Sequence, residues 1–188
     1  MTRVRLEIDE IEIYRPKKRW KLYFVIMADH PTEDDKMIIT TLPSEPFKLS
    51  RKHDNKYQFD TKNIGSEGLF VLSRELPPDR ELNVHIRLFH TRKSTRDLGE
   101  ILKKVEEGIT GETFGIVSDI VGSSSPWLII AKKAVSLTGT ILSKVKDRPF
   151  GFLSAFERFG PEFESQQEID YKKKFTGDAS LVYSWSVD

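Results

Sequence analysis

Apolar and polar residues alternate with a period of two along the first ninety residues and again near the end of the chain. This period is typical of strands with one face in a core and the other toward solvent. Gly, Pro, Asn and Asp separate the alternating runs, a pattern that predicts an antiparallel β-sandwich. The expected strands are residues 4–13, 20–28, 37–42, 47–50, 56–60, 69–75, 82–89, 167–175 and 181–187.

The first expected strand changes phase in its middle. Apolar residues stand at even positions up to Ile8 and at odd positions from Ile11 onward. An extra residue at Asp9-Glu10 would keep both sets on one face, so we predict a β-bulge there. We also expect the first two strands to form an antiparallel hairpin around the basic turn at residues 15–19.

The period lengthens to three or four residues between Pro126 and Val145. Ser125 is a good N-cap and Pro126 suits the first position of a helix. The apolar stripe predicts a helix that packs on the core, or alternatively one that lies on a membrane surface. Interior lysines disfavour a transmembrane span. The stripe consists of Trp127, Ile130, Ala134, Thr138, Ile141 and Val145.

Two further segments fit a helical period. The first runs from Leu98 to Val105, and the second places four phenylalanines on one helical face, at positions 152, 156, 159 and 163. We therefore expect a mainly β protein with an α insertion (α+β). In this prediction, 1–188 is a single domain, 1–93 and 165–188 form the sandwich, and 94–164 is a helical insertion between late strands.

Composition restricts the classes of function. The chain has 188 residues, with 30 Lys and Arg against 29 Asp and Glu, so its net charge of +1 disfavours a general nucleic-acid binder. The absence of cysteine excludes disulfides, thiol catalysis and Cys-ligated zinc. The first residues contain no apolar run like that of a signal peptide, so we expect a cytoplasmic protein.

Catalytic motifs are absent from the sequence, which has neither a Gly-x-Ser-x-Gly elbow nor a P-loop. Of the four histidines, His85 and His90 lie five positions apart on one expected strand and should point to opposite faces. Pairing of neighbouring strands could bring Ser73 and Arg74 to His85 and Arg87. An enzyme with a loop-assembled site around His85 and Arg87 is therefore one alternative.

The loop after the second strand is acidic, with Asp29, Glu33, Asp34 and Asp35. Carboxylate oxygens are ligands that calcium prefers, although a solvated charged turn explains the same residues. A sandwich with such a loop resembles a C2 domain over residues 3–42. The resemblance implies a peripheral membrane module with calcium as cofactor, held by Asp29, Asp34 and Asp35. The chain departs from that family in having no Asp-x-Asp pattern.

The sequence favours a non-enzymatic binding or assembly module that needs no cofactor. The sandwich would be the scaffold, and the apolar insertion would face a protein partner or a second copy of the chain. A membrane surface is the alternative partner, and nucleic acid is disfavoured. The expected partner-binding residues are Trp127, Ile130, Ile141, Phe152, Phe156 and Phe159.

Overall fold

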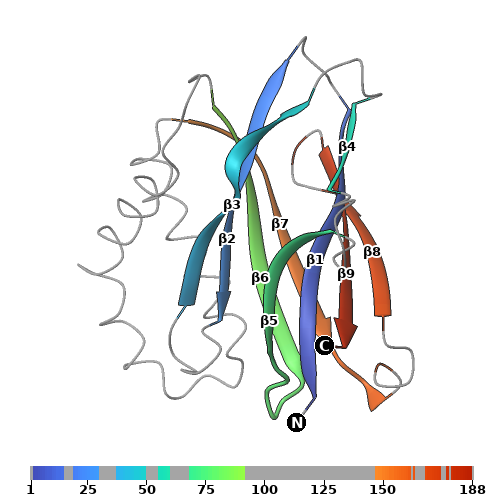
Figure 1. Cartoon of the computed structure of the whole chain (residues 1–188). Coiled ribbons are helices and arrows are strands. Elements are labelled where there is room, and N and C mark those ends of the chain that lie inside the picture. The colour runs from blue at the N-terminus through green and yellow to red at the C-terminus, as the bar shows by residue number, and fades with distance from the viewer. Residues whose placement is uncertain are drawn as a thin grey trace, which may run out of the picture.

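Two antiparallel sheets make up the part of the chain described by the computed structural model (Figure 1). Sheet A has the order β4-β1-β9-β8, with β5 also paired to β1, and sheet B has the order β3-β2-β6-β7. The structure describes residues 2–14, 19–29, 37–49, 55–59, 68–91, 147–161, 163, 168–174, 177 and 179–187. The strands are β1 (Arg3–Ile13), β2 (Trp20–Asp29), β3 (Met37–Leu49), β4 (Lys56–Gln58), β5 (Leu69–Glu75), β6 (Glu81–His90), β7 (Arg148–Arg158), β8 (Glu168–Lys174) and β9 (Ala179–Val187).

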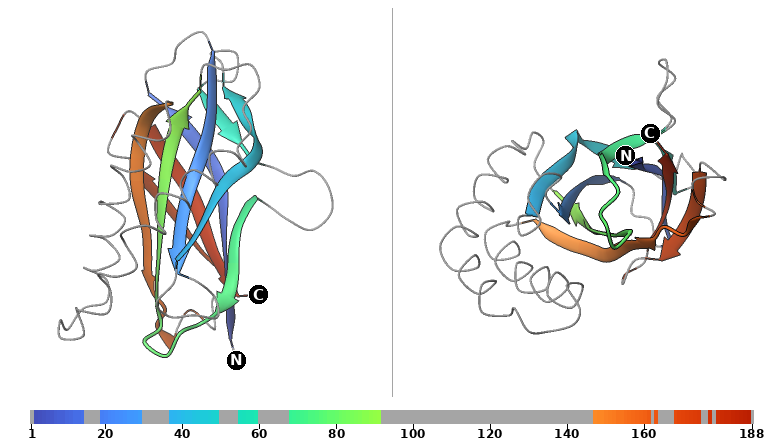
Figure 2. Two further views of the ribbon diagram at one scale, coloured as in Figure 1. Left: turned by 90° about the vertical axis from the view of Figure 1, so that its left-hand side faces the viewer. Right: turned by 90° about the horizontal axis from the view of Figure 1, so that it is seen from below.

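The hydrophobic core lies between the two sheets, which face each other when the molecule is seen from below (Figure 2). Alternate residues of each strand point inward, as a period of two requires. β1 and β9 lie side by side in sheet A, with Leu6 opposite Trp185 and Ile8 opposite Tyr183, and all four side chains are fully buried. From sheet B, β2 and β6 supply Phe24, Ile26, Val84, Ile86 and Leu88.

The predicted bulge in β1 is confirmed. The register between β1 and β9 shifts between Ile8 and Glu10, so Asp9 is the extra residue. This shift keeps Val4, Leu6, Ile8, Ile11 and Ile13 on the core face of one strand. The outward residues of β1 are charged, as the alternation indicated.

The predicted hairpin between the first two strands is wrong. β1 belongs to sheet A and β2 to sheet B, so the two strands pack across the core instead of pairing. Each strand has one strongly apolar face, and this pattern fits two facing sheets as well as it fits a hairpin. Pairing partners therefore could not be assigned from the pattern of either strand alone.

The predicted α+β class with a helical insertion at 94–164 is also corrected. Residues Arg148–Arg158 form β7, which pairs antiparallel with β6 along its whole length. Phe152 and Phe156 are four positions apart, a spacing that keeps side chains on one side of a strand as well as of a helix. The elements of the described residues are all strands. The helical patterns at 98–105 and 126–145 lie outside the described residues.

Candidate functional site

The outer face of sheet B differs from an ordinary solvent-facing surface. Asn83, His85, Arg87 and Phe89 alternate along β6 with core residues and therefore point away from the core. These four side chains nevertheless retain at most 8% of their accessible surface. On the neighbouring strand β2, the outward residues Tyr23, Val25 and Met27 are fully buried. Sheet B is therefore buried on both faces over β2 and β6.

A chain of hydrogen bonds crosses from β7 to β6 on this face. The Ser154 hydroxyl donates to Oδ1 of Asn83 at 2.6 Å, and Nδ2 of Asn83 lies 3.3 Å from Nε2 of His85. Because an amide nitrogen can only donate, Nε2 of His85 accepts this bond and the proton of the neutral ring sits on Nδ1. That Nδ1 is buried and has no hydrogen-bond partner among the described residues.

Burial keeps His85 neutral. Burial, together with a smaller effect of the positive charge of Arg87, lowers the pKa of the imidazole from 6.5 to about 4. Burial also lowers the pKa of the Arg87 guanidinium. At neutral pH the face therefore holds a neutral imidazole beside a cation.

Phe152 joins these two groups. Its ring stacks on the imidazole of His85, with centroids 5.6 Å apart and an angle of 18° between the planes. The guanidinium carbon of Arg87 lies 4.8 Å from the centre of the same ring, within the range of a cation–π interaction. Register explains the arrangement, since Phe152 is directly opposite Arg87 and Ser154 directly opposite His85.

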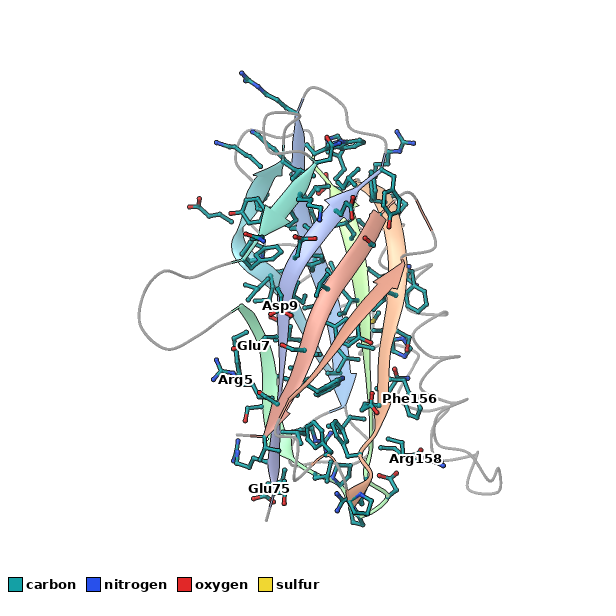
Figure 3. The ribbon with its side chains drawn as sticks, turned by 90° about the vertical axis from the view of Figure 1, so that its right-hand side faces the viewer. Arg5, Glu7, Asp9, Glu75, Phe156 and Arg158 are labelled. Atoms are coloured by element: carbon teal, nitrogen blue, oxygen red, sulfur yellow. The ribbon has the colours of Figure 1, made fainter. Side chains whose placement is uncertain are left out.

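Exposure increases from β6 to β7. The outward residues of β7, Phe152, Ser154 and Phe156, are only partly buried, whereas their partners on β6 are almost inaccessible. Figure 3 shows Phe156 on β7, on the side of the molecule away from Arg5, Glu7 and Asp9 of β1. The rim of the face along β7 is thus its accessible part.

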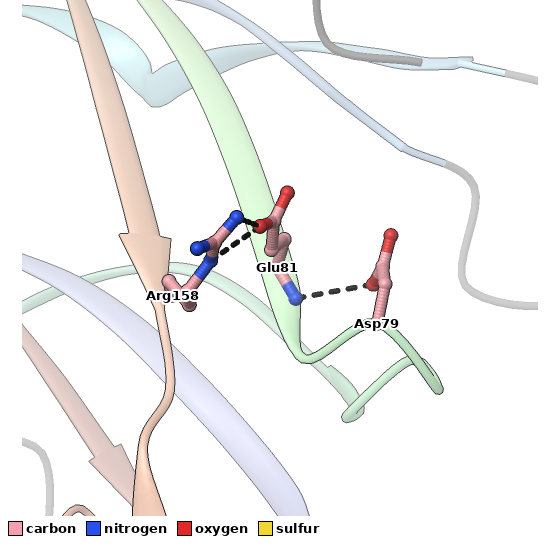
Figure 4. Close-up of polar contacts among 3 residues, drawn as sticks. All are labelled: Asp79, Glu81 and Arg158. Carbon is pink, nitrogen blue, oxygen red and sulfur yellow. Dashed lines mark hydrogen bonds and ion pairs between the residues drawn. The ribbon is translucent and has the colours of Figure 1, made fainter. Parts of the chain in front are cut away.

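A separate polar cluster fastens β7 to β6 at one end of this face (Figure 4). Arg158 forms an ion pair with Glu81, and the backbone N–H of Glu81 donates to Oδ1 of Asp79 at 3.1 Å. Arg80 adopts a φ of 57° and donates through Nε to the carbonyl of Phe159 at 2.6 Å. These contacts fix the register that aligns Ser154 with His85.

The hydrogen-bonded chain from Ser154 to His85 does not have the geometry of a serine nucleophile with its base. A serine nucleophile must be hydrogen-bonded to its base, but the Ser154 hydroxyl donates to an amide oxygen instead. A general base works best with a pKa near the operating pH, and the pKa of His85 is about 4. Among the described residues, no three His, Cys, Asp or Glu side chains are placed to hold a metal ion.

The structure brings together part of the predicted polar patch. His85 and Arg87 lie on one face of β6, whereas Ser73 and Arg74 belong to β5 in the other sheet. His90 lies on the opposite face of β6, where its ring meets the core residue Trp20 edge to face. The prediction that His85 and His90 point to opposite faces is therefore confirmed.

The predicted partner-binding residues are separated in the fold. Phe152 and Phe156 share the outer face of β7, but Phe159 is 1% exposed and its ring packs in the core against Phe163 and Trp185. Asp29 is the last residue of β2, paired with Met37. The remaining candidates lie outside the described residues: Trp127, Ile130 and Ile141 for a partner, and Asp34 and Asp35 for calcium.

Sequence reasoning missed Asn83 and Ser154. Asn83 could have been found, because a polar residue two positions before His85 on a strand shares its face. Ser154 could not, because it was assigned to a helix and its place opposite His85 depends on the register between β6 and β7.

Within the described ranges, the chain contains no helix with the length and apolar character needed to cross a bilayer. No protein-family model matches the chain, and no curated protein matches it significantly. Any role of the outer face of sheet B must therefore be inferred from its own side chains.

Proposed function

We propose that the protein is a non-enzymatic protein-binding module, and that its partner contacts the outer face of sheet B along β7. The observation that carries this proposal is the pair Phe152 and Phe156. Both are partly exposed and lie on the outer face of β7, which pairs only with β6 among the described strands. They flank Ser154 on β7, and the polar side chains beneath them, Ser154, Asn83 and His85, are linked by hydrogen bonds.

The physical setting of the two rings suits a protein interface. Aromatic side chains and arginine are enriched where interface energy is concentrated, because they bury a large area at a small entropic cost. Phe152 already has its orientation fixed between His85 and Arg87. A partner that covers this ring gains apolar burial without having to order it first.

The polar groups beneath the rings support a binding role over a catalytic one. The Ser154 hydroxyl is engaged by Asn83, and His85 stays neutral and buried at physiological pH. Such a network holds side chains in place and specifies a unique arrangement. The partner that can be tested directly is a second copy of the chain.

Sedimentation velocity of the purified chain over a range of micromolar concentrations tests the proposal. We expect reversible self-association that weakens in Phe152→Ser and Phe156→Ser, with the sedimentation coefficient falling to that of a monomer. The matched control is Phe70→Ser, which removes a phenylalanine that is 47% exposed on the other sheet and should leave association unchanged. A wild-type chain that is monomeric throughout, or an equal effect of Phe70→Ser, would contradict the proposal.

A further inference from the structure

The edge of β7 that faces away from β6 carries a further inference, which rests on the proposed partner site and specifies how the partner is bound. β7 is the end strand of sheet B, and among the described strands it pairs only with β6. The backbone N–H and C=O groups along such an edge are a template for pairing with another chain. Native proteins usually block this template with charged residues, prolines or bulges.

The middle of β7 lacks this kind of protection. Residues 150–156 read Phe-Gly-Phe-Leu-Ser-Ala-Phe, with neither a charge nor a proline. The strand at the opposite end of sheet B, β3, contains two prolines and two charged residues within residues 43–48. The end strand of sheet A, β8, finishes with three lysines. The edge of β7 is therefore better suited to accept another strand than the edges of β3 and β8.

The part of this edge that can accept a strand has a limit at each end. At its start, Gly177 lies so close to Phe150 that an added Cβ would be 2.4 Å from the carbonyl oxygen of Phe150. At its end, the N–H of Phe159 donates to the carbonyl of Arg80, by which point β7 has ended. Residues 152–156 lie between these limits, and Ser154 is at their centre.

The sequence around Ser154 is self-complementary in an antiparallel pair. Pairing of two β7 strands about a two-fold axis at Ser154 places Phe152 of each chain opposite Phe156 of the other, and Leu153 opposite Ala155. The two phenylalanines are on the partly exposed outer face, whereas Leu153 and Ala155 belong to the core. Aromatic residues directly opposite each other are among the cross-strand pairs that stabilise a sheet.

We propose that a second copy of the chain binds by antiparallel pairing of β7 with its own β7, centred on Ser154, so that sheet B continues through both molecules. The pairing gives hydrogen-bond partners to the backbone groups of both edges. It also aligns two phenylalanines from each chain in one row on the outer face. Because a two-fold contact is closed, neither β7 keeps an edge for a third copy, and association through β7 stops at a dimer.

Cysteine cross-linking of the intact chain tests this pairing, since the sequence contains no cysteine. In Ser154→Cys the two introduced thiols face each other across the axis, with Cβ atoms about 4.5–5.5 Å apart. We expect a short bifunctional thiol reagent to shift this variant to twice the chain mass. Arg158→Cys is the matched control, because the side chain at this position is 74% exposed. Position 158 lies opposite position 150 of the other chain, so its two thiols are about 26 Å apart and the mass should stay that of one chain.

Amide hydrogen exchange of the unaltered chain gives a second measurement that needs no substitution. The amides of β7 that do not bond to β6 gain partners in the dimer, so exchange within 152–157 should slow as the protein concentration rises. The comparison peptide is β5, which belongs to the other sheet and should exchange at the same rate at every concentration.

The outcomes distinguish this pairing from the partner site on which it rests. A chain whose association depends on Phe152 and Phe156, but in which Ser154→Cys cross-links no better than Arg158→Cys, would bind its partner through the face and not along the edge. Unchanged exchange of β7 in a chain that associates would overturn the pairing in the same way. A wild-type chain that is monomeric throughout would overturn both proposals.

Discussion

Acidification should destabilise the fold through His85. The pKa of this imidazole is lowered from 6.5 to about 4 in the native state, mainly by burial, and Arg87 adds to the effect. Below pH 6.5 the unfolded chain therefore binds a proton that the native chain does not. Stability is complete above pH 6.5, falls as the pH decreases toward 4, and levels off below that value.

The magnitude follows from the shift. Each pKa unit corresponds to about 1.4 kcal/mol, so the full effect below pH 4 is about 3 kcal/mol. Between pH 7 and pH 5, the same two pKa values give a loss of about 2 kcal/mol. This is a large part of the stability of an ordinary domain, which is about 5–15 kcal/mol.

The groups around the ring of His85 account for the size of this effect. On β6 the charged neighbour is Arg87, and the residues directly opposite, Met27 on β2 and Ser154 on β7, do not titrate. Protonation would also add a donor at Nε2, where the amide of Asn83 already donates. A protonated His85 would therefore face the N–H donor of Asn83 at Nε2 and the positive charge of Arg87, and both interactions are repulsive.

Urea unfolding at pH 7, 6 and 5 measures the effect, with tryptophan fluorescence as the signal because Trp185 is fully buried. The free energy of unfolding is compared between wild type and His85→Gln, whose side chain retains a hydrogen-bond acceptor but cannot titrate. The difference between their pH dependences is the contribution of His85. His90→Gln is the matched control, and its free energy of unfolding should fall between pH 7 and pH 5 as that of wild type does, because His85 is still present. If His85→Gln loses as much stability as wild type between pH 7 and pH 5, the assignment of a buried neutral imidazole is wrong.

Three further predictions concern stability and can be measured by the midpoint of urea unfolding. Ser154→Ala should cost about 1–2 kcal/mol, because it leaves the buried Oδ1 of Asn83 without its donor; an unchanged midpoint would mean that the hydrogen bond is not formed. Gly177→Ala should cost about 1–3 kcal/mol, because the added Cβ would overlap the carbonyl oxygen of Phe150; a neutral result would show that the turn can shift freely. Arg158→Gln should cost less than about 1 kcal/mol, since this side chain is 74% exposed despite its ion pair; a larger loss would identify the pair as structural.

Apart from β7, the strands were predictable, because the alternating runs carry a period of two that survives even a bulge. The shift at Asp9 could be seen in the sequence because it moves the apolar set from even to odd positions. The assignment of strands to sheets could not be predicted. An apolar core face is common to strands of both sheets, and nothing in β1 specifies that its partners are β4, β5 and β9.

The main error concerned β7. Phe152, Phe156 and Phe159 follow a helical spacing, but only the first two lie on one face of the strand, and Phe159 turns into the core after the strand ends. Pairing with β6 decides the conformation here, and local pattern does not reveal such a long-range partner. For the same reason, only the part of the candidate site that lies on β6 could be recognised from the sequence. Asn83, His85 and Arg87 share a strand, whereas Ser154 and Phe152 join them only through register.

The pairing of β1 with β9 determines when the molecule can fold. β1 is synthesised well before β9, so one edge of β1 stays without its native partner until residues 179–187 have been made. Contacts between residues so distant along the chain slow folding, because the entropy of closing the intervening loop is lost before the contacts can form and offset it. We therefore expect sheet A to stay incomplete in the nascent chain until β9 has been synthesised and can pair with β1.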